Sequence, residues 1–289
     1  MIRALLQSLG IRPPARLSEL HPALYQAAVW KNRARRYADW YLGPARWCSV
    51  RQELPLPFRV KRHASRLLKQ LGESEMWLQH NKVKNLAIAI PALTDVLIRP
   101  GETFSFCQLV GRPTRARGYV ESMELSRGKV RPGVGGGICQ LANMIHWLVL
   151  HSPLTVVERS NHSFDPFPDQ NRSIPFGTGA AIFYNYVDLQ FRNDTPATFQ
   201  LRLWMTDVDL WGDLRADRQP EHVYSVFEKN HRFERHEGAW YRRNEIWRKV
   251  MPWGGGPCLA EEFLKANSAR TLYEPHGGRV TEQREGRAD

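Results

Sequence analysis

Apolar residues in the first third of the chain recur at the three- and four-residue spacing of a helix that buries one face. This pattern predicts helices over residues 17–41, 61–71 and 79–94. Two prolines in the segment 54–57 separate the first helix from the second, because proline removes a backbone N–H donor and clashes with the preceding turn. The N-terminal third is therefore expected to be mainly helical.

From residue 96 onward, short runs of β-type composition alternate with glycine and proline. The run 103–106 follows the turn-forming residues 99–101, and the run 119–126 precedes a second turn at 127–129. Such runs beside such turns are typical of β-hairpins. We therefore expect antiparallel strands to begin here.

The stretch 138–150 follows a run of glycines and is long and apolar enough to be a buried helix. Further strands are expected at 155–157 and 180–191, and another helix is expected to start at Cys258. Together these elements predict an α+β fold, in which a mixed core with antiparallel strands around a buried helix follows a helical basic N-terminal segment.

The charge pattern suggests how this fold is divided. The net charge is +12, and the first 99 residues hold 17 Lys and Arg against 6 Asp and Glu, whereas the other 190 hold 24 against 23. We expect a basic helical N-terminal segment at 1–78 and a core at 79–205. A C-terminal extension at 206–289 is expected to pack on that core and to end in a frayed tail.

The composition, with 42% apolar and 24% charged residues over 289 positions, is typical of a soluble globular protein. The longest apolar run, 86–98, is interrupted by Pro91 and Asp95, so no membrane-spanning helix is expected. Residues 1–9 lack the features of a signal peptide, which favours a location in the cytoplasm or at the periphery of a membrane.

A basic and aromatic stretch at 30–41 lies within the first predicted helix. Such a stretch is suited to an anionic membrane or polymer surface. The favoured alternative is a solvated helix face, because basic runs often serve only solubility. No nucleic-acid-binding motif accompanies it, so nucleic acid is the weakest of the possible partners.

Among the four cysteines, which show no CxxC spacing, Cys139 has the most informative surroundings. It follows Gly135, Gly136 and Gly137 at the start of the predicted helix 138–150. A helix N-terminus favours a thiolate, and glycine N–H groups are available to hold an oxyanion. Cys139 is thus placed as a nucleophile would be. The alternative is a small buried core residue.

A nucleophilic cysteine needs a base. His146 lies on the same helix face as Cys139 but about 10 Å along the axis, which excludes direct contact. His162 follows a strand that returns over about the length of the helix, so it is expected near the helix start. A loop histidine with a backbone hydrogen bond is the alternative for His162.

A third group would orient the imidazole, and Asp188 is the candidate on the predicted strand 180–191, with Asp165 as the local alternative. Gln140 and Asn143 lie close to Cys139 and would polarise a substrate carbonyl, or they merely form local hydrogen bonds. The histidines show no convincing ligand spacing, so no metal and no cofactor is expected.

Several motifs taken together resemble the VanW family, over roughly residues 60 to 275. They are Pro100-Gly101-Glu102-Thr103-Phe104-Ser105-Phe106, Gly118-Tyr119, Pro132-Gly133-Val134-Gly135-Gly136-Gly137-Ile138-Cys139-Gln140, Glu158-Arg159-Ser160-Asn161-His162-Ser163 and Phe191-Arg192-Asn193. The resemblance implies a role at peptidoglycan or its precursors, because some multidomain relatives are thought to use this domain as a cysteine L,D-transpeptidase. It implies Cys139 as the nucleophile and His162 as its partner.

One departure from the family pattern affects the substrate site. Many wall-associated members carry an Arg-Asp pair where this sequence reads Phe176-Gly177-Thr178-Gly179-Ala180-Ala181, and Arg172 is the candidate replacement. We therefore expect acyl transfer from a peptidoglycan stem peptide or precursor through a Cys139 thioester. The alternative is a non-catalytic module that binds an anionic envelope ligand linked to glycopeptide resistance.

Overall fold

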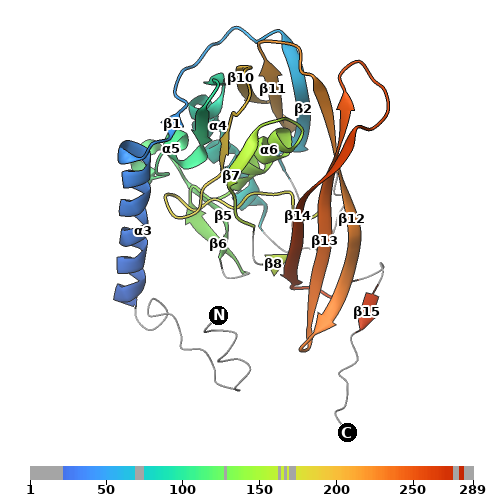
Figure 1. The fold of residues 1–289 in the computed structure, drawn as a ribbon. Coiled ribbons are helices and arrows are strands. Elements are labelled where there is room, and N and C mark those ends of the chain that lie inside the picture. Colours follow the sequence, from blue (N-terminus) through green and yellow to red (C-terminus); the bar gives the residue numbers. More distant parts are fainter. Residues whose placement is uncertain are drawn as a thin grey trace. The chain divides into compact units, whose positions relative to one another are not determined.

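The computed structural model describes residues 22–68, 75–126, 129–161, 164–165, 168, 174–275 and 280–282. The chain divides into two compact units, one up to Ala45 and one from Arg46 onward. The described part of the first unit contains helix α3 (Pro22–Leu42), which confirms the predicted N-terminal helix over its described residues (Figure 1). This division lies inside the expected basic segment, and the boundaries expected at residues 78 and 205 stay predictions.

The second unit combines helices with β-sheets, which confirms the α+β class. Its elements, in chain order, are β1 (Arg46–Trp47), β2 (Phe58–Arg66), α4 (Met76–Leu93), β3 (Val96–Ile98), β4 (Glu102–Ser105), α5 (Phe106–Val110), the 3₁₀-helix η1 (Arg115–Arg117), β5 (Glu121–Ser126), β6 (Lys129–Val134), α6 (Cys139–Leu150), β7 (Thr155–Glu158), β8 (Phe164–Asp165), β9 (Gln190–Arg192), β10 (Phe199–Met205), β11 (Asp209–Ala216), β12 (His222–His236), β13 (Ala239–Pro252), β14 (Ala260–Thr271) and β15 (Val280–Glu282). None of the described helices has the length and hydrophobicity that crossing a bilayer requires.

The hydrophobic core lies between helices α4 and α6 and the antiparallel sheet β2-β11-β10-β3. Helix α6 is buried along most of its length, as its apolar sequence predicts. It lies close to β11 at Gly212, where a Cβ would be 2.8 Å from Met144 Cγ and 2.9 Å from Leu148 Cδ1. A glycine on the strand thus lets the helix pack directly against the sheet backbone.

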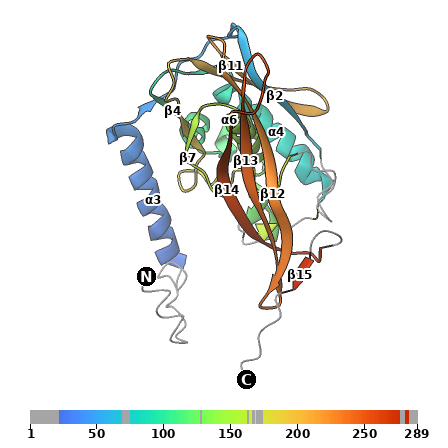
Figure 2. The same ribbon diagram turned by 45° about the vertical axis from the view of Figure 1, so that its right-hand side comes forward.

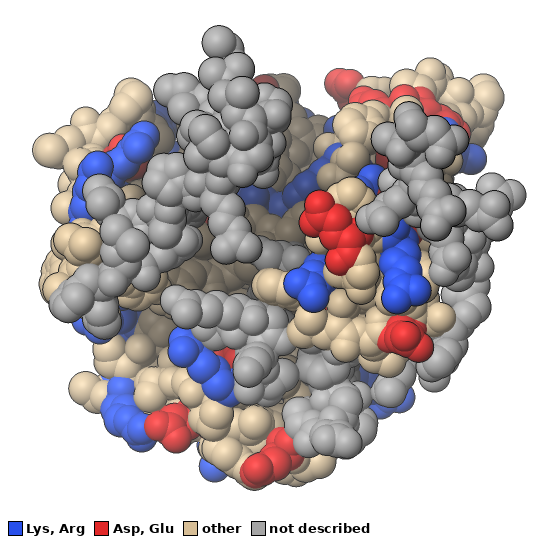
Figure 3. All heavy atoms as spheres, turned by 90° about the horizontal axis from the view of Figure 1, so that it is seen from below, with Lys and Arg blue, Asp and Glu red and all other residues tan. Residues whose placement is uncertain are grey.

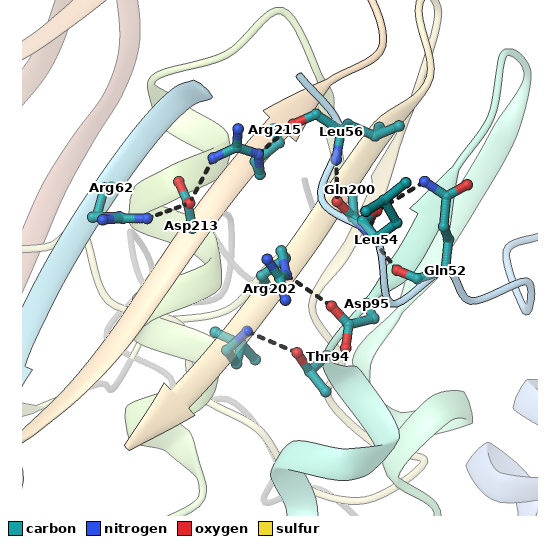
Figure 4. Close-up of polar contacts among 11 residues, drawn as sticks. Gln52, Leu54, Leu56, Arg62, Thr94, Asp95, Gln200, Arg202, Asp213 and Arg215 are labelled. Carbon is teal, nitrogen blue, oxygen red and sulfur yellow. Dashed lines mark hydrogen bonds and ion pairs between the residues drawn. The ribbon is translucent and has the colours of Figure 1, made fainter. Parts of the chain in front are cut away.

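Polar side chains attach neighbouring segments to this sheet (Figure 4). Gln200 on β10 accepts from Leu56 N–H at 2.8 Å and donates to the Leu54 carbonyl at 3.2 Å, so one buried amide holds the proline-rich segment before β2. Asp213 on β11 is buried and is paired with Arg62 at 2.8 Å and Arg215 at 3.2 Å. The buried amide and the buried carboxylate, both on central strands of this sheet, thus bind residues of the segment before β2, of β2 and of β11.

The C-terminal region forms the sheet β15-β12-β13-β14-β8, whose three long strands run antiparallel (Figures 1 and 2). Arg248 on β13 donates to the carbonyl of Ser152 at 2.8 Å and so links this sheet to the end of α6. Basic and acidic side chains are interspersed among uncharged ones over the described part of the face seen from below (Figure 3). Within the C-terminal sheet, opposite charges form pairs such as Lys229 with Glu261, at 2.6 Å.

Other predictions are confirmed in the second unit. Helix α4 matches the predicted helix 79–94 and α6 the predicted helix 138–150. Strands β5 and β6 pair as the expected antiparallel hairpin, and β7 covers the strand expected at 155–157.

The predicted helix at 61–71 is wrong where the structure describes it, because residues up to 66 belong to β2 and pair with β11. The run 103–106 is largely strand β4, but it forms no hairpin across 99–101. Instead β3 pairs with β10, and β4 pairs with β1 and β9. In both cases the pairing partner is distant in sequence, so local pattern does not reveal it.

The long strand expected over 180–191 is also wrong, since only β9 (Gln190–Arg192) is a strand there. A tight turn joins Phe183 to Val187, with Asn185 at a positive φ of 55°, a backbone conformation that interrupts a strand. The residues after Cys258 form strand β14 rather than a helix, because they pair with β13. Within the tail expected to be frayed, β15 pairs with β12, and residues 276–279 and 283–289 lie outside the described part.

The glycine turn before α6 fits into a space with no room for a side chain. A Cβ on Gly136 would lie 2.4 Å from the carbonyl oxygen of Ser122 and 2.8 Å from that of Met123, and one on Gly137 would lie 2.2 Å from Lys82 Cγ. The amide of Asn85 on α4 donates to the carbonyls of Val120 and Gly136, both at 3.0 Å. The turn is therefore clamped between α4 and β5.

We predict that Gly136→Ala lowers the free energy of unfolding by about 3 kcal/mol, because the new methyl group meets backbone oxygens that cannot rotate away. Gly254→Ala is the matched control, since nothing lies within 4 Å of its Cβ position, and its effect should stay within about 0.5 kcal/mol. Urea unfolding followed by circular dichroism measures both. Equal stability of the two variants would contradict the close packing.

Candidate functional site

Cys139 is the first residue of α6, directly after the clamped turn. Gly135 and Gly137 have positive φ values of 77° and 82°, which only glycine adopts at little cost. These two conformations direct the backbone from the end of β6 to the start of α6. The position of Cys139 is therefore fixed by the packing of the turn against α4 and β5.

Two of the three glycine N–H groups expected to receive an oxyanion are already used. Gly135 donates to the Val120 carbonyl at 3.1 Å, and Gly136 donates to the Gly133 carbonyl at 3.0 Å. Among the described residues, no backbone hydrogen bond uses the N–H groups of Gly137 and Ile138, whereas the N–H of Cys139 interacts with its own thiol. The two unused donors, directly before α6, are where the geometry can hold a negative oxygen.

Cys139 is half-buried as a residue, its thiol is enclosed by the protein, and Sγ donates to the carbonyl of Ile182 at 3.8 Å. Burial of the thiol raises its pKa above the ordinary value, and the hydrogen bonds from its surroundings offset only part of this effect. The expected stabilisation of the thiolate is thus not found in the free protein. A thiol with a raised pKa is protonated at neutral pH and needs a base before it can react.

The two amides proposed to polarise a substrate both contact protein. Gln140 Nε2 donates to the Arg66 carbonyl at 2.8 Å and so connects α6 to β2, while Asn143 Oδ1 accepts from Ala180 N–H at 2.7 Å. Gln140 Oε1 is buried and has no partner among the described residues.

His162 and Arg172 lie outside the described residues. His146 is buried, and its Nδ1 lies 2.6 Å from the carbonyl of Thr178, as expected of a satisfied core histidine. Burial is the main cause that lowers the pKa of His146, to about 3, so this imidazole is neutral.

Asp188 is fully buried and accepts from Ser105 Oγ at 2.5 Å and from Cys107 N–H at 2.8 Å. Burial raises its pKa, while these hydrogen bonds oppose the shift. The local alternative, Asp165, is paired with Arg242 at 3.2 Å. Both carboxylates thus have structural partners, and no described contact joins either of them to Cys139.

The sequence reasoning missed the polar residues of α4 that support the site. Gln79, Lys82 and Asn85 are buried, and Lys82 Nζ donates to Gln79 Oε1 at 2.7 Å and also to the Leu67 carbonyl. Their three-residue spacing on a predicted helix could have revealed them, because it places all three polar side chains on one helix face. Polar side chains on a buried face need specific hydrogen-bond partners. In the described part of the chain, no group of His, Cys, Asp and Glu side chains is arranged to hold a metal ion.

We predict that neutral iodoacetamide at pH 7.5 alkylates exposed Cys258 at least about tenfold faster than Cys139, because a thiol with a raised pKa contains little thiolate. The rate at Cys139 should increase as the pH rises above the ordinary thiol pKa of about 8.5. Peptide mass spectrometry of timed samples measures both rates. Faster labelling of Cys139 than of Cys258 at pH 7.5 would indicate an activated thiolate instead.

Comparison with known proteins matches residues 81–215 to the family described as VanW like protein. The Vancomycin B-type resistance protein VanW of Enterococcus faecalis (strain ATCC 700802 / V583) is 30% identical over 258 residues, which cover 89% of this chain and 94% of that protein. The Uncharacterized protein YoaR of Bacillus subtilis (strain 168) is 33% identical over 112 residues, 38% of this chain and 34% of that protein. No solved structure matches the chain.

Proposed function

This chain belongs to the VanW family, and we propose that it acts on peptidoglycan or its precursors and contributes to resistance against glycopeptides. The relative named for vancomycin resistance supports this, because the similarity extends over nearly the whole of both chains. The matched region 81–215 includes the clamped glycine turn and Cys139.

The proposed reaction is acyl transfer through a thioester on Cys139. The observation that carries it is the Cys139 thiol at the start of α6, next in the chain to the N–H groups of Gly137 and Ile138, which no described group uses. Such donors stabilise the oxyanion that forms when a nucleophile attacks an amide carbonyl. The raised pKa of the thiol means that substrate binding must be accompanied by proton transfer to a base. By family resemblance, this base is His162.

In the first step of the proposed reaction, the thiol proton passes to His162 as Sγ bonds to the carbonyl carbon of a stem peptide. The carbon–nitrogen bond then breaks, and the leaving amine takes the proton from the imidazole. The thioester next reacts with a second amine or with water. That acceptor gives its proton to the departing sulfur, which restores the Cys139 thiol.

A second candidate is binding without chemistry, in which the N–H groups of Gly137 and Ile138 hold a carboxylate or phosphate of an envelope ligand. The specific observation in its favour is the raised pKa of Cys139, because a binding site needs no ionised thiol. Covalent and non-covalent binding are distinguished by the mass of the protein.

We expect the full chain, incubated with a peptidoglycan tetrapeptide or a carbapenem, to gain the mass of the acyl group, and Cys139→Ala to gain none. Cys258→Ala is the control, since its exposed thiol lies after β13 and outside the proposed site, and it should acylate like the parent. Intact-protein mass spectrometry measures the adducts. Acylation of Cys139→Ala to the parent level would overturn the thioester mechanism, whereas ligand binding without any adduct would favour the second candidate.

We also propose that α3 attaches the protein to an anionic surface. Trp30, Tyr37 and Tyr41 are exposed on this helix, and Lys31 and Arg35 are exposed beside them. Aromatic rings settle into the headgroup region of a membrane while the cations attract anionic headgroups. This arrangement supports peripheral attachment.

The full chain is therefore expected to sediment with vesicles of phosphatidylcholine that contain phosphatidylserine, and less with phosphatidylcholine alone. Lys31→Glu with Arg35→Glu should lower the bound fraction at least about fivefold, because each cation near the surface contributes about 1 kcal/mol. Lys249→Glu, at an exposed position of β13, is the control, since it also reverses the charge of a basic side chain but lies outside α3. Vesicle binding that is unchanged by the α3 substitutions would refute this role.

A further inference from the structure

A cavity of about 290 Å³ lies beside the C-terminal half of α6, away from Cys139. Its apolar wall includes Val149 on α6, Leu154 before β7, Ile246 on β13 and Leu264 on β14. The volume is near the lower limit of small-molecule sites, which run from about 300 Å³ upward. The cavity is thus suited to a small ligand with an apolar part.

The polar groups that line this cavity include three cations, Arg159, Arg248 and Lys265, and its described lining contains no carboxylate. Arg248 is neutralised by Glu262 at 2.6 Å. Arg159 Nε donates to the carbonyl of Gly179 at 2.8 Å, and its Nη2 donates to the carbonyl of Gly177. Both acceptors are neutral, and no described carboxylate forms an ion pair with Arg159.

Lys265 is the second uncompensated cation. It is half-buried, and no hydrogen bond or ion pair joins its ammonium to any described residue. Burial, followed by the nearby charge of Arg159, lowers the pKa of Lys265 to about 8. The neutral His146 on the same wall supplies no negative charge. Two positive charges thus face one apolar cavity, and their desolvation and mutual repulsion are unfavourable. A bound anion would offset this unfavourable free energy.

We propose that this cavity is a binding site for a small carboxylate with a short aliphatic chain. The carboxylate pairs with Lys265 and Arg159, and the chain lies against the apolar wall. Inorganic phosphate would pair with the two cations but would not fill the space beside the apolar wall. An alcohol with an aliphatic chain would contact the wall but would not neutralise the cations. The cavity is separate from the reaction proposed for Cys139. His146, which lines the cavity, lies about 10 Å along helix α6 from Cys139.

The test is isothermal titration calorimetry of the full chain at pH 7 with hexanoate, 1-hexanol and inorganic phosphate as separate probes. Hexanoate should bind at least about tenfold more tightly than either of the others. Lys265→Met keeps the length of the side chain and should weaken hexanoate binding at least about tenfold, since a charge-assisted pair is lost. Lys265→Arg should retain it, and Lys249→Met on β13 should be without effect.

Competitive amine labelling locates the ligand in the same samples. At pH 8, acetic anhydride should modify Lys265, and hexanoate should protect Lys265 but leave the exposed Lys249 unprotected. Cys139→Ser should bind hexanoate like the parent, even if it loses all acylation. Absence of hexanoate binding, unchanged binding by Lys265→Met, lack of protection at Lys265, or loss of binding in Cys139→Ser would each overturn the proposal.

Discussion

The close packing of the glycine turn against α4 and β5 determines where α6 begins, and the rest of the site depends on it. No side chain fits at Gly136, because the carbonyls of Ser122 and Met123 occupy the space, and the Asn85 amide fixes the turn by hydrogen bonds. This arrangement leaves the N–H groups of Gly137 and Ile138, directly before α6, without a backbone partner among the described residues, and Cys139 follows them. The polar contacts of α4 thus fix the backbone of the turn from which α6 starts.

The thiol itself shows that two physical effects compete at the start of a helix. The favourable interaction of a charge with a helix terminus is worth roughly 0.3–1 kcal/mol, and up to about 2 kcal/mol when partly buried. Desolvation shifts the pKa of fully buried groups by up to about 3–5 units, and each unit corresponds to about 1.4 kcal/mol. The raised pKa of Cys139 is consistent with these magnitudes, since desolvation is its largest cause. Position at a helix N-terminus is therefore not sufficient to ionise a cysteine.

Helix α6 connects two chemically different environments. At its start, a neutral thiol lies near unused donors, and beside its last turns, uncompensated cations face an apolar cavity. The segment that contains Gly179 and Ile182 runs along the helix between them, because Asn143 binds Ala180 and Cys139 contacts Ile182. Arg159 also holds this segment through the Gly177 and Gly179 carbonyls. One backbone segment thus forms part of both environments.

Local sequence was sufficient for α4, α6 and the β5–β6 hairpin, because their helical periodicity, continuous apolar character and turn residues are properties of neighbouring residues. It was also sufficient to select Cys139 and its glycines and to indicate the family. Only the tertiary structure decided that residues 61–66 are a strand, that Asp188 serves Ser105 and Cys107, and that Cys139 has a raised pKa. These outcomes depend on backbone pairing and on desolvation by residues far apart in the chain, which no local pattern contains.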